Sequence, residues 1–247
     1  LRAAGKRTLL LSHVPRPNDA VQTMLRRMRI DDSLYTGILT SGEAVRRALL
    51  TPPDLWWTEL GTRVFHLGPE RDRPVLEGLP FAVTDTPADA DFVLNTGPDD
   101  RRNPSDMAEF EAVLAECARH RLKMICANPD LEVIRGGVRV LCAGALAVRY
   151  QELGGDVRSL GKPDPAIYQP VLEQLGLPPE QVLAVGDSLR TDIAGAVGVD
   201  LAACWVLDGI PGVDLRNPDG TFATARAETT ARQAGVLPVA TVPRFAW

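Results

Sequence analysis

Short apolar runs and amphipathic stretches alternate along most of the chain. Thr8–Leu11 is an apolar run that leads into a proline-rich turn, and it predicts a strand. Val21, Met24 and Leu25 then recur at the spacing of one helix face and predict an amphipathic helix. The same criteria predict further strands at Tyr35–Leu39, Arg63–Leu67, Ala82–Val83, Asp91–Thr96, Lys123–Ala127, Val138–Leu141, Val182–Val185 and Ala202–Leu207, and further helices at Pro104–His120, Ala145–Leu153, Ala166–Leu175, Asp192–Val197 and Thr224–Ala234.

Local signals mark two of the helix starts. Asn18 follows the proline-rich turn and is predicted to cap the first helix. Thr40 and Glu43 have the spacing of a capping box, which predicts a helix that runs to about Leu50. The prolines at 52–53 end this helix, because proline cannot continue one.

Strands that alternate with helices indicate βαβ units, so the predicted fold class is α/β with a parallel sheet. The apolar run Val182–Val185 is typical of a strand covered on both faces. The pattern is interrupted near residues 52–53 and again at the glycines 154–155. These interruptions predict an inserted second domain at about residues 55–157, with residues 1–54 and 158–247 forming one sheet.

Composition and charge exclude several classes of protein. Apolar residues make up 45% and charged residues 24% of the 247 residues, as in ordinary globular proteins. A net charge of −5 and a pI near 5.3 provide no basic surface for nucleic acid. No uncharged apolar run is long enough to span a bilayer, and the first residues do not resemble a secretion signal. We therefore expect no nucleic-acid partner, no membrane association and a cytoplasmic location.

The sequence also argues against a zinc site and a disulfide framework. The three histidines are scattered, and the four cysteines lie far apart without a C-x-x-C pair. Buried, reduced thiols are the prediction for the cysteines Cys117, Cys126, Cys142 and Cys204.

Two acids follow the carboxyl end of the predicted strand Val182–Val185. Asp187 comes directly after Gly186, and Asp192 lies five residues further, near a predicted helix start. Carboxylates in such a place suit Mg²⁺, which takes carboxylate and phosphate oxygens. The alternative, of equal weight, makes Asp187 a turn residue and Asp192 an acid favoured by the helix dipole. This segment alone leaves both interpretations open.

Polar residues at other strand ends are further candidates, since ligands of open α/β sheets bind beyond the carboxyl ends of strands. The Ser12 hydroxyl and the following N–H groups could bind a phosphate oxygen, although a serine before such a turn is more often loop chemistry. His13 is interpreted as a turn residue with no role in proton transfer. Lys162, held between Gly161 and Pro163, suits charge stabilisation of a phosphoryl group, or is a solvated surface lysine.

Asn128–Asp130 ends a predicted strand of the insertion, where it lines a substrate pocket or makes a turn.

Together, the segments named so far occur in an order that resembles the haloacid dehalogenase-like (HAD) hydrolases. The similarity is to the NagD-like subgroup (class IIA), which has a large C2-type α/β cap between its second and third motifs. The segments are Ser12 with Pro15–Pro17, Thr40–Ala44, Ala127–Asp130, Gly161–Pro163 and Val185–Ile193, and the run GDSLRTDIAGA from residue 186 is the most specific.

The resemblance implies a Rossmann-like parallel-sheet core with an inserted α/β cap domain at residues 55–157. It also implies hydrolysis of a phosphate monoester of a small metabolite through a phospho-aspartate, with Mg²⁺ as cofactor, and, by analogy alone, a homodimer. The roles it implies follow the motifs. Ser12 and the backbone at His13 would bind the phosphoryl group, Lys162 would neutralise charge, Asp187 would ligate Mg²⁺, Asp192 and Ser188 would support the metal site from behind, and Asn128 and Asp130 of the cap would contact the rest of the substrate.

One family motif is missing from the printed residues. D-x-D-G, which carries the nucleophilic aspartate, precedes the serine motif by one crossover, and a βαβ unit needs about 30 residues. Only 11 residues precede Ser12, and none is aspartate. We therefore expect the nucleophile to lie in an N-terminal segment absent from this sequence, without which the chain is inactive.

Two rival functions remain. One is a non-catalytic regulatory protein that binds phosphate or metal. The other, a nucleotide-binding protein of another family, is disfavoured because no G-x-G-x-x-G or G-K-[ST] loop occurs. The sequence does not specify the substrate.

Overall fold

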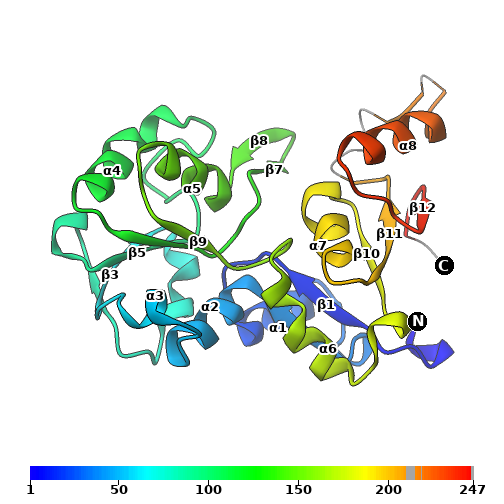
Figure 1. Ribbon diagram of the computed structural model, residues 1–247, viewed down its shortest axis with the longest axis horizontal. Coiled ribbons are helices and arrows are strands. Elements are labelled where there is room, and N and C mark those ends of the chain that lie inside the picture. Colours follow the sequence, from blue (N-terminus) through cyan, green and yellow to red (C-terminus); the bar gives the residue numbers. More distant parts are fainter. Residues whose placement is uncertain (210–214, 218, 246–247) are drawn as a thin grey trace. The chain divides into compact units, whose positions relative to one another are not determined.

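The computed structural model describes residues 1–209, 215–217 and 219–245, and the chain divides into two compact units, Leu1–Gly161 and Lys162–Trp247. Each unit combines parallel strands with helices, which confirms the predicted α/β class (Figure 1). Among the described residues, no helix combines the length and apolar character that crossing a bilayer requires. The grouping of residues 1–54 with 158–247 as one domain stays a prediction.

The largest sheet lies in the first unit and has five parallel strands. Its strands are short, and each is positioned by its neighbour's backbone hydrogen bonds. In sheet order they are β4 (Ala82–Thr84), β3 (Arg63–Leu67), β5 (Phe92–Asn95), β6 (Lys123–Cys126) and β9 (Val157–Ser159).

Both faces of this sheet are covered, because successive side chains of a strand point to opposite faces. Val93 packs against α4 (Ala108–Arg119) and α5 (Ala143–Glu152). Phe92 and Leu94 pack on the other face, against α2 (Ser41–Leu50), α3 (Leu55–Thr58) and a 3₁₀ helix at 70–76. All four residues of β5 are buried, as expected for a central parallel strand.

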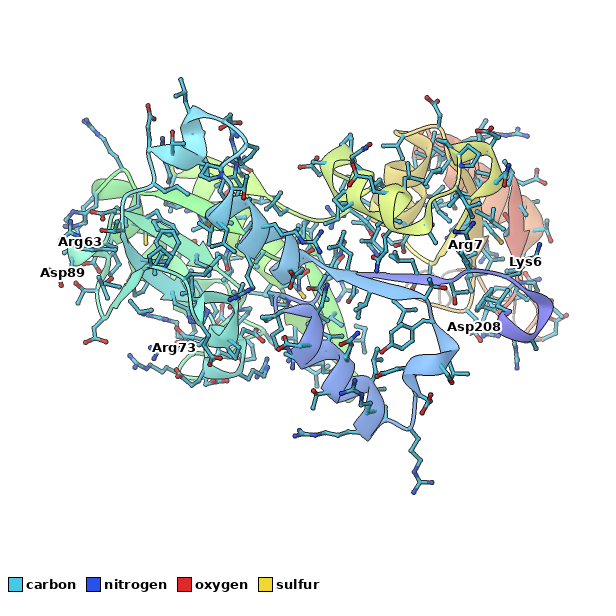
Figure 2. All side chains as sticks on the ribbon, turned by 90° about the horizontal axis from the view of Figure 1, so that it is seen from below. Lys6, Arg7, Arg63, Arg73, Asp89 and Asp208 are labelled. Carbon is cyan, nitrogen blue, oxygen red and sulfur yellow. The ribbon has the colours of Figure 1, made fainter. Side chains whose placement is uncertain are left out.

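The remaining sheets of the first unit are small. β1 (Leu9–Ser12) pairs in parallel with β2 (Gly37–Thr40), and α1 (Asn18–Arg27) packs against them through Val21. An antiparallel hairpin consists of β7 (Glu132–Arg135) and β8 (Val138–Leu141). In the five-stranded sheet, Arg63 at the start of β3 donates a hydrogen bond to Asp91. Figure 2 shows the side chains of Arg63 and Asp89 at the periphery.

The second unit contains a three-stranded parallel sheet in the order β10–β11–β12. A π-helical turn at 189–193 joins β10 to a short helix, and both the turn and the helix pack against β11. The bounds are α6 (Gln169–Leu175), β10 (Leu183–Gly186), α7 (Ala194–Val197), β11 (Ala202–Val206), α8 (Thr224–Gln233) and β12 (Ala240–Val242).

Two local predictions were wrong. Asn18 does not cap α1: it is the first helical residue, and its side chain instead accepts a hydrogen bond from the Thr40 N–H at 3.1 Å. The strand at 183–186 is not covered on both faces, since Leu183 and Val185 are 53% and 40% exposed. Both residues point to the same face, so this face of β10 is exposed, while Ala184 and Gly186 on the other face are partly buried.

Other predictions were confirmed. The Thr40 hydroxyl accepts from the Glu43 N–H at 2.9 Å and caps α2. All four cysteines are buried and none forms a disulfide, and burial raises the pKa of Cys142 to about 11.

Replacing Phe110 by alanine tests how strongly this packing stabilises the first unit. Phe110 lies on α4, is fully buried and packs within the cluster around Val93. The cavity left by the ring should lower the free energy of unfolding by about 3–5 kcal/mol in urea denaturation. The control Val148→Ala, at a side chain 47% exposed on α5, should change it by less than about 0.5 kcal/mol. Equal effects at the two positions would contradict this description of the core.

Candidate active site

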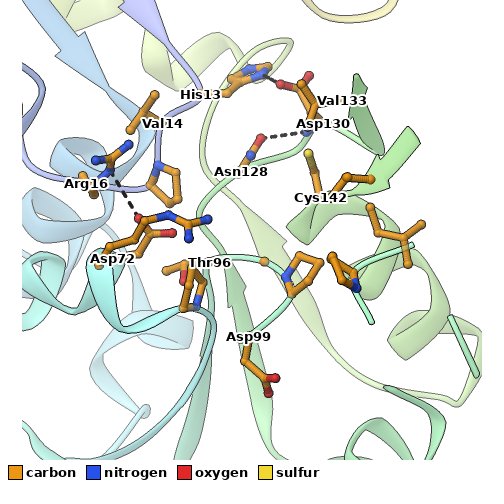
Figure 3. A pocket seen from close by; sticks show the side chains of 18 of the residues that line it. His13, Val14, Arg16, Asp72, Thr96, Asp99, Asn128, Asp130, Val133 and Cys142 are labelled. Carbon is orange, nitrogen blue, oxygen red and sulfur yellow. Dashed lines mark hydrogen bonds and ion pairs between the residues drawn. The ribbon is translucent and has the colours of Figure 1, made fainter. Parts of the chain in front are cut away.

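A cavity of about 550 Å³ lies in the first unit, in the size range of small-molecule sites (Figure 3). Its walls follow the carboxyl ends of parallel strands. Ser12 is the last residue of β1, and the lining residues 13–16 follow it. Asp72 lies on the 3₁₀ helix that follows β3, Thr96 follows β5, and Asn128 follows β6. The hairpin β7–β8 contributes Val133 and Val140. The topology therefore brings together loops that are far apart in sequence.

Ser12 and His13 form one end of this cavity. The Val14 N–H donates to the Ser12 hydroxyl at 3.3 Å, so the side chain is fixed by its own loop. His13 is buried, and its Nδ1 lies 2.9 Å from Asp130 Oδ2. Its Nε2 is buried without a hydrogen-bond partner. Such an atom is costly to bury and indicates a position where a ligand can supply the missing partner.

Asn128 and Asp130 line the same cavity as Ser12 and His13. The Asn128 side chain accepts from the Asp130 N–H at 3.1 Å, which holds the turn in place. Figure 3 shows Asp130 directed toward His13. The structure thus unites four residues that sequence reasoning had assigned to the phosphate and to the substrate, while their roles stay predictions.

Asp72 is a lining residue that sequence reasoning missed. Its side chain is only 6% exposed, and its one ion-pair contact within the described part of the chain is Arg16 Nε at 3.3 Å (Figure 3). Burial raises the pKa of Asp72 to about 6, although Arg16 and other nearby arginines oppose the shift. No local signal marks this residue, because the run Glu70–Arg73 has the alternating charges of an exposed segment.

The loop that carries Arg16 is held against the start of α2. The Arg16 carbonyl accepts from the Thr40 hydroxyl at 2.6 Å, and the Gly42 N–H donates to the Val14 carbonyl at 3.2 Å. A side chain at Gly42 would collide with the Arg16 backbone. Glycine is required here by close approach of two backbones rather than by its dihedral angles.

A second group of predicted site residues lies in the second unit, around the Asp192 carboxylate. The Lys162 ammonium donates to Asp192 Oδ1 at 2.7 Å. The N–H groups of Asp187 and Ser188 donate to Asp192 Oδ2 at 3.2 and 3.1 Å. Asp192 therefore fixes the turn after β10 and orients Lys162 at the same time. The Ser188 hydroxyl accepts from the Thr191 N–H at 3.3 Å and caps the π-helical turn.

Asp187 is the residue of this group that fits a magnesium ligand. The described part of the chain holds no group of three or more histidine, cysteine, aspartate or glutamate side chains arranged for a metal. Mg²⁺ nevertheless binds commonly through one or two carboxylates, completed by waters and substrate phosphate oxygens. One carboxylate at the end of a strand agrees with such a site. Asp192 accepts hydrogen bonds from Lys162 and two backbone amides.

The predicted site residues thus fall into two sets. Ser12, His13, Asn128 and Asp130 belong to the first unit, whereas Lys162, Asp187, Ser188 and Asp192 belong to the second. Their convergence on one phosphate stays a prediction.

Comparisons with known proteins agree with the fold. The family model described as HAD-hydrolase-like matches residues 159–230. A haloacid dehalogenase-like hydrolase from Brucella suis 1330 superposes with a TM-score of 0.81 at 27% identity, over 99% of this chain and 85% of its own. Chronophin from Mus musculus is 26% identical over 96% of this chain and 79% of its own length. Ribonucleotide monophosphatase NagD from Escherichia coli K12 is 27% identical over 74% of this chain and 66% of its own length.

Residues 159–230 therefore match the haloacid dehalogenase-like hydrolases, and the chain as a whole has the fold of a hydrolase of that family. Its similarity to chronophin and to NagD supports a NagD-like HAD hydrolase of the phosphoric monoester hydrolase class.

Replacing Asp192 by alanine should destabilise the second unit. The change removes the acceptor that Lys162 and two backbone amides share, at a side chain 15% exposed. We expect a loss of about 2–3 kcal/mol in the free energy of unfolding, measured by urea denaturation. Glu180→Ala, an exposed acid of the same unit, should change the value by less than about 0.5 kcal/mol. A loss no greater than that of the control would show that Asp192 does not hold the turn.

Asp72 should give the protein a pH-dependent stability. Its pKa is raised from 3.8 to about 6, so between these values the folded protein holds a proton that the unfolded chain has released. The free energy of unfolding therefore falls as pH rises through this window, by about 2–3 kcal/mol from this residue. In Asp72→Asn that contribution is absent, so the variant should gain this amount relative to the unsubstituted protein between pH 4 and pH 7. Parallel pH profiles would contradict the burial of this carboxylate.

Proposed function

We propose that this protein is a Mg²⁺-dependent phosphatase that hydrolyses phosphate monoesters of small metabolites through a phospho-aspartate. The observation that carries the proposal is the Asp192 carboxylate, which holds both the Lys162 ammonium and the turn with Asp187. An ammonium and a carboxylate fixed in this way suit a dianionic phosphoryl group and a metal beside it. The segment also lies within the residues that the family model matches.

The proposal gives each residue a task that its surroundings permit. Lys162 is 14% exposed, and its carboxylate partner limits the directions that its ammonium can take. It would offset negative charge on the transferring phosphoryl group. Ser12 and the N–H after it would donate hydrogen bonds to the phosphoryl oxygens, a task that needs the hydroxyl proton and leaves its contact with Val14 intact.

Asp187 would hold Mg²⁺, and the bound ion would supply positive charge that polarises the phosphoryl group. The Trp205 indole N–H donates to the Asp187 backbone carbonyl at 2.9 Å, so this residue is fixed from the sheet side. A carboxylate positioned by its backbone needs little rearrangement when the ion binds.

The reaction requires an aspartate that the 247 residues do not contain in a D-x-D-G motif. Its carboxylate oxygen would form a bond to phosphorus while the ester P–O bond breaks and the leaving oxygen takes a proton. Water would then attack the phosphorus of the aspartyl phosphate and release inorganic phosphate.

The full-length gene product should hydrolyse p-nitrophenyl phosphate in the presence of Mg²⁺. Asp187→Asn should lower kcat/KM about 100-fold or more, because the metal loses its charged ligand. Calorimetry should show a parallel loss of Mg²⁺ affinity. Glu180→Gln, which neutralises an exposed acid of the same unit, is the matched control and should keep both properties.

Equal turnover by Asp187→Asn would remove this residue from the chemistry. If the unsubstituted protein binds Mg²⁺ and phosphate without any turnover, the regulatory function replaces the catalytic one.

A further inference from the structure

The cavity of the first unit holds a nearly buried aspartate, Asp72, and a partly buried arginine, Arg16, that the proposed chemistry does not use. Asp72 has one contact at 3.3 Å, and Arg16 Nε, also buried, makes no hydrogen bond. A shielded carboxylate that only stabilises the fold normally accepts several hydrogen bonds from the protein, as Asp192 does. Asp72 instead keeps its acceptor capacity for the cavity that it lines.

The charges along the cavity decide which group can occupy this position. Four arginines and four aspartates line it, and three of each face one another in pairs: Arg16 with Asp72, Arg71 with Asp100, and Arg102 with Asp99. Asp130 faces His13, and Arg135 lies exposed on the hairpin. The cavity walls therefore carry no large excess of positive or negative charge.

A charged leaving group would fit this lining poorly. An added carboxylate near Arg16 would also lie close to Asp72, and an added ammonium near Asp72 would lie close to Arg16. Either one would be repelled by a neighbour of like charge in a partly desolvated space. A neutral hydroxyl avoids both costs, because its O–H can donate to Asp72 while its oxygen accepts from the guanidinium.

The site is also fixed before a ligand arrives. The Arg16 loop is held by the Thr40 hydroxyl and by close contact with Gly42. Three residues before Arg16 on the same loop, the His13 Nε2 is a second buried atom without a hydrogen-bond partner. The cavity thus offers unfilled hydrogen-bonding positions near Asp72 and at His13, with room for a leaving group that carries several polar atoms.

We infer that the leaving group of the substrate is a neutral polyhydroxylated chain or ring, of sugar or polyol type, whose hydroxyls bind the Asp72–Arg16 pair. This inference rests on the proposed function, since it assumes that the ester phosphate of the same molecule binds at Ser12. Asp72 and Arg16 then determine specificity, and the bound hydroxyl gives the buried carboxylate the donor that it lacks.

Kinetics on a matched set of phosphates tests the inference. The set is sorbitol 6-phosphate, n-hexyl phosphate without hydroxyls, 6-phosphogluconate with an added carboxylate, and 6-aminohexyl phosphate with an added ammonium. Sorbitol 6-phosphate should have the highest kcat/KM, at least tenfold above n-hexyl phosphate, because a site built for hydroxyls rejects an analogue that lacks them. A higher value for either charged compound, or equal values for all four, would overturn the inference.

Variants assign the preference to these residues. In Asp72→Asn and in Arg16→Lys, the ratio of kcat/KM for sorbitol 6-phosphate over n-hexyl phosphate should fall at least fivefold. Asp85→Asn removes the same charge from an exposed position outside the cavity lining and should leave the ratio within about twofold. A ratio that is unchanged in both cavity variants would overturn the inference, even where overall activity falls.

Binding without turnover separates this inference from the proposed function. In calorimetry without Mg²⁺, sorbitol 6-phosphate should bind at least tenfold more tightly than n-hexyl phosphate, and Asp72→Asn should remove the difference. Should no phosphate be hydrolysed, the proposed function fails, and the binding preference still decides the inference. Equal binding of both compounds would overturn it.

Discussion

The common direction of the strands in the first unit is the constraint on which its cavity depends. β3, β5 and β6 run parallel, so the segments that follow them leave the sheet at the same edge. The sheet can keep this order only because both of its faces are buried, with Val93 on one side and Phe92 and Leu94 on the other. The packed sheet thus fixes where the loops that line the cavity begin, and so it determines the shape of the cavity.

A partly buried aspartate, Asp192, and a buried one, Asp72, differ in how fully the protein itself supplies their hydrogen bonds. Asp192 accepts from an ammonium and two backbone amides, and it fixes a turn. Asp72 is more shielded from water than Asp192, at 6% against 15% exposure, but its one ion-pair contact in the described part of the chain is Arg16 Nε at 3.3 Å and its pKa is raised. The hydrogen bonds to Asp192 offset the cost of removing its charge from water within the protein. For Asp72, the missing hydrogen bonds would have to come from another molecule.

Sequence reasoning succeeded where the determining contacts are local and failed where they are distant. The cap formed by Thr40 and Glu43 depends on residues three apart, and it was predicted correctly. β9 was missed because Val157–Ser159 has little strand character of its own and is placed by pairing with β6. The Asn18 side chain was assigned to its own helix, but a residue 22 positions away captured it.

The same distinction holds for the candidate site. Asp187 and Lys162 were proposed because motifs of recognisable order surround them, and Ser12 because it ends a strand; their roles stay predictions. Asp72 could not be found, since its neighbours Arg71 and Arg73 give its segment the composition of a solvated surface. Its burial arises from the fold of loops that join different strands.

Two glycines limit how such a cavity can diversify. A side chain at Gly42 would collide with the Arg16 backbone, and one at Gly144 would collide with the carbonyls of Pro129 and Asp130. Each glycine lies at the start of a helix and clamps a loop of the cavity wall. The main chain around the cavity therefore leaves little room for change. To alter the ligand preference of this scaffold, exchanging the side chains at positions 16, 72 and 135 is a more promising route than remodelling loops.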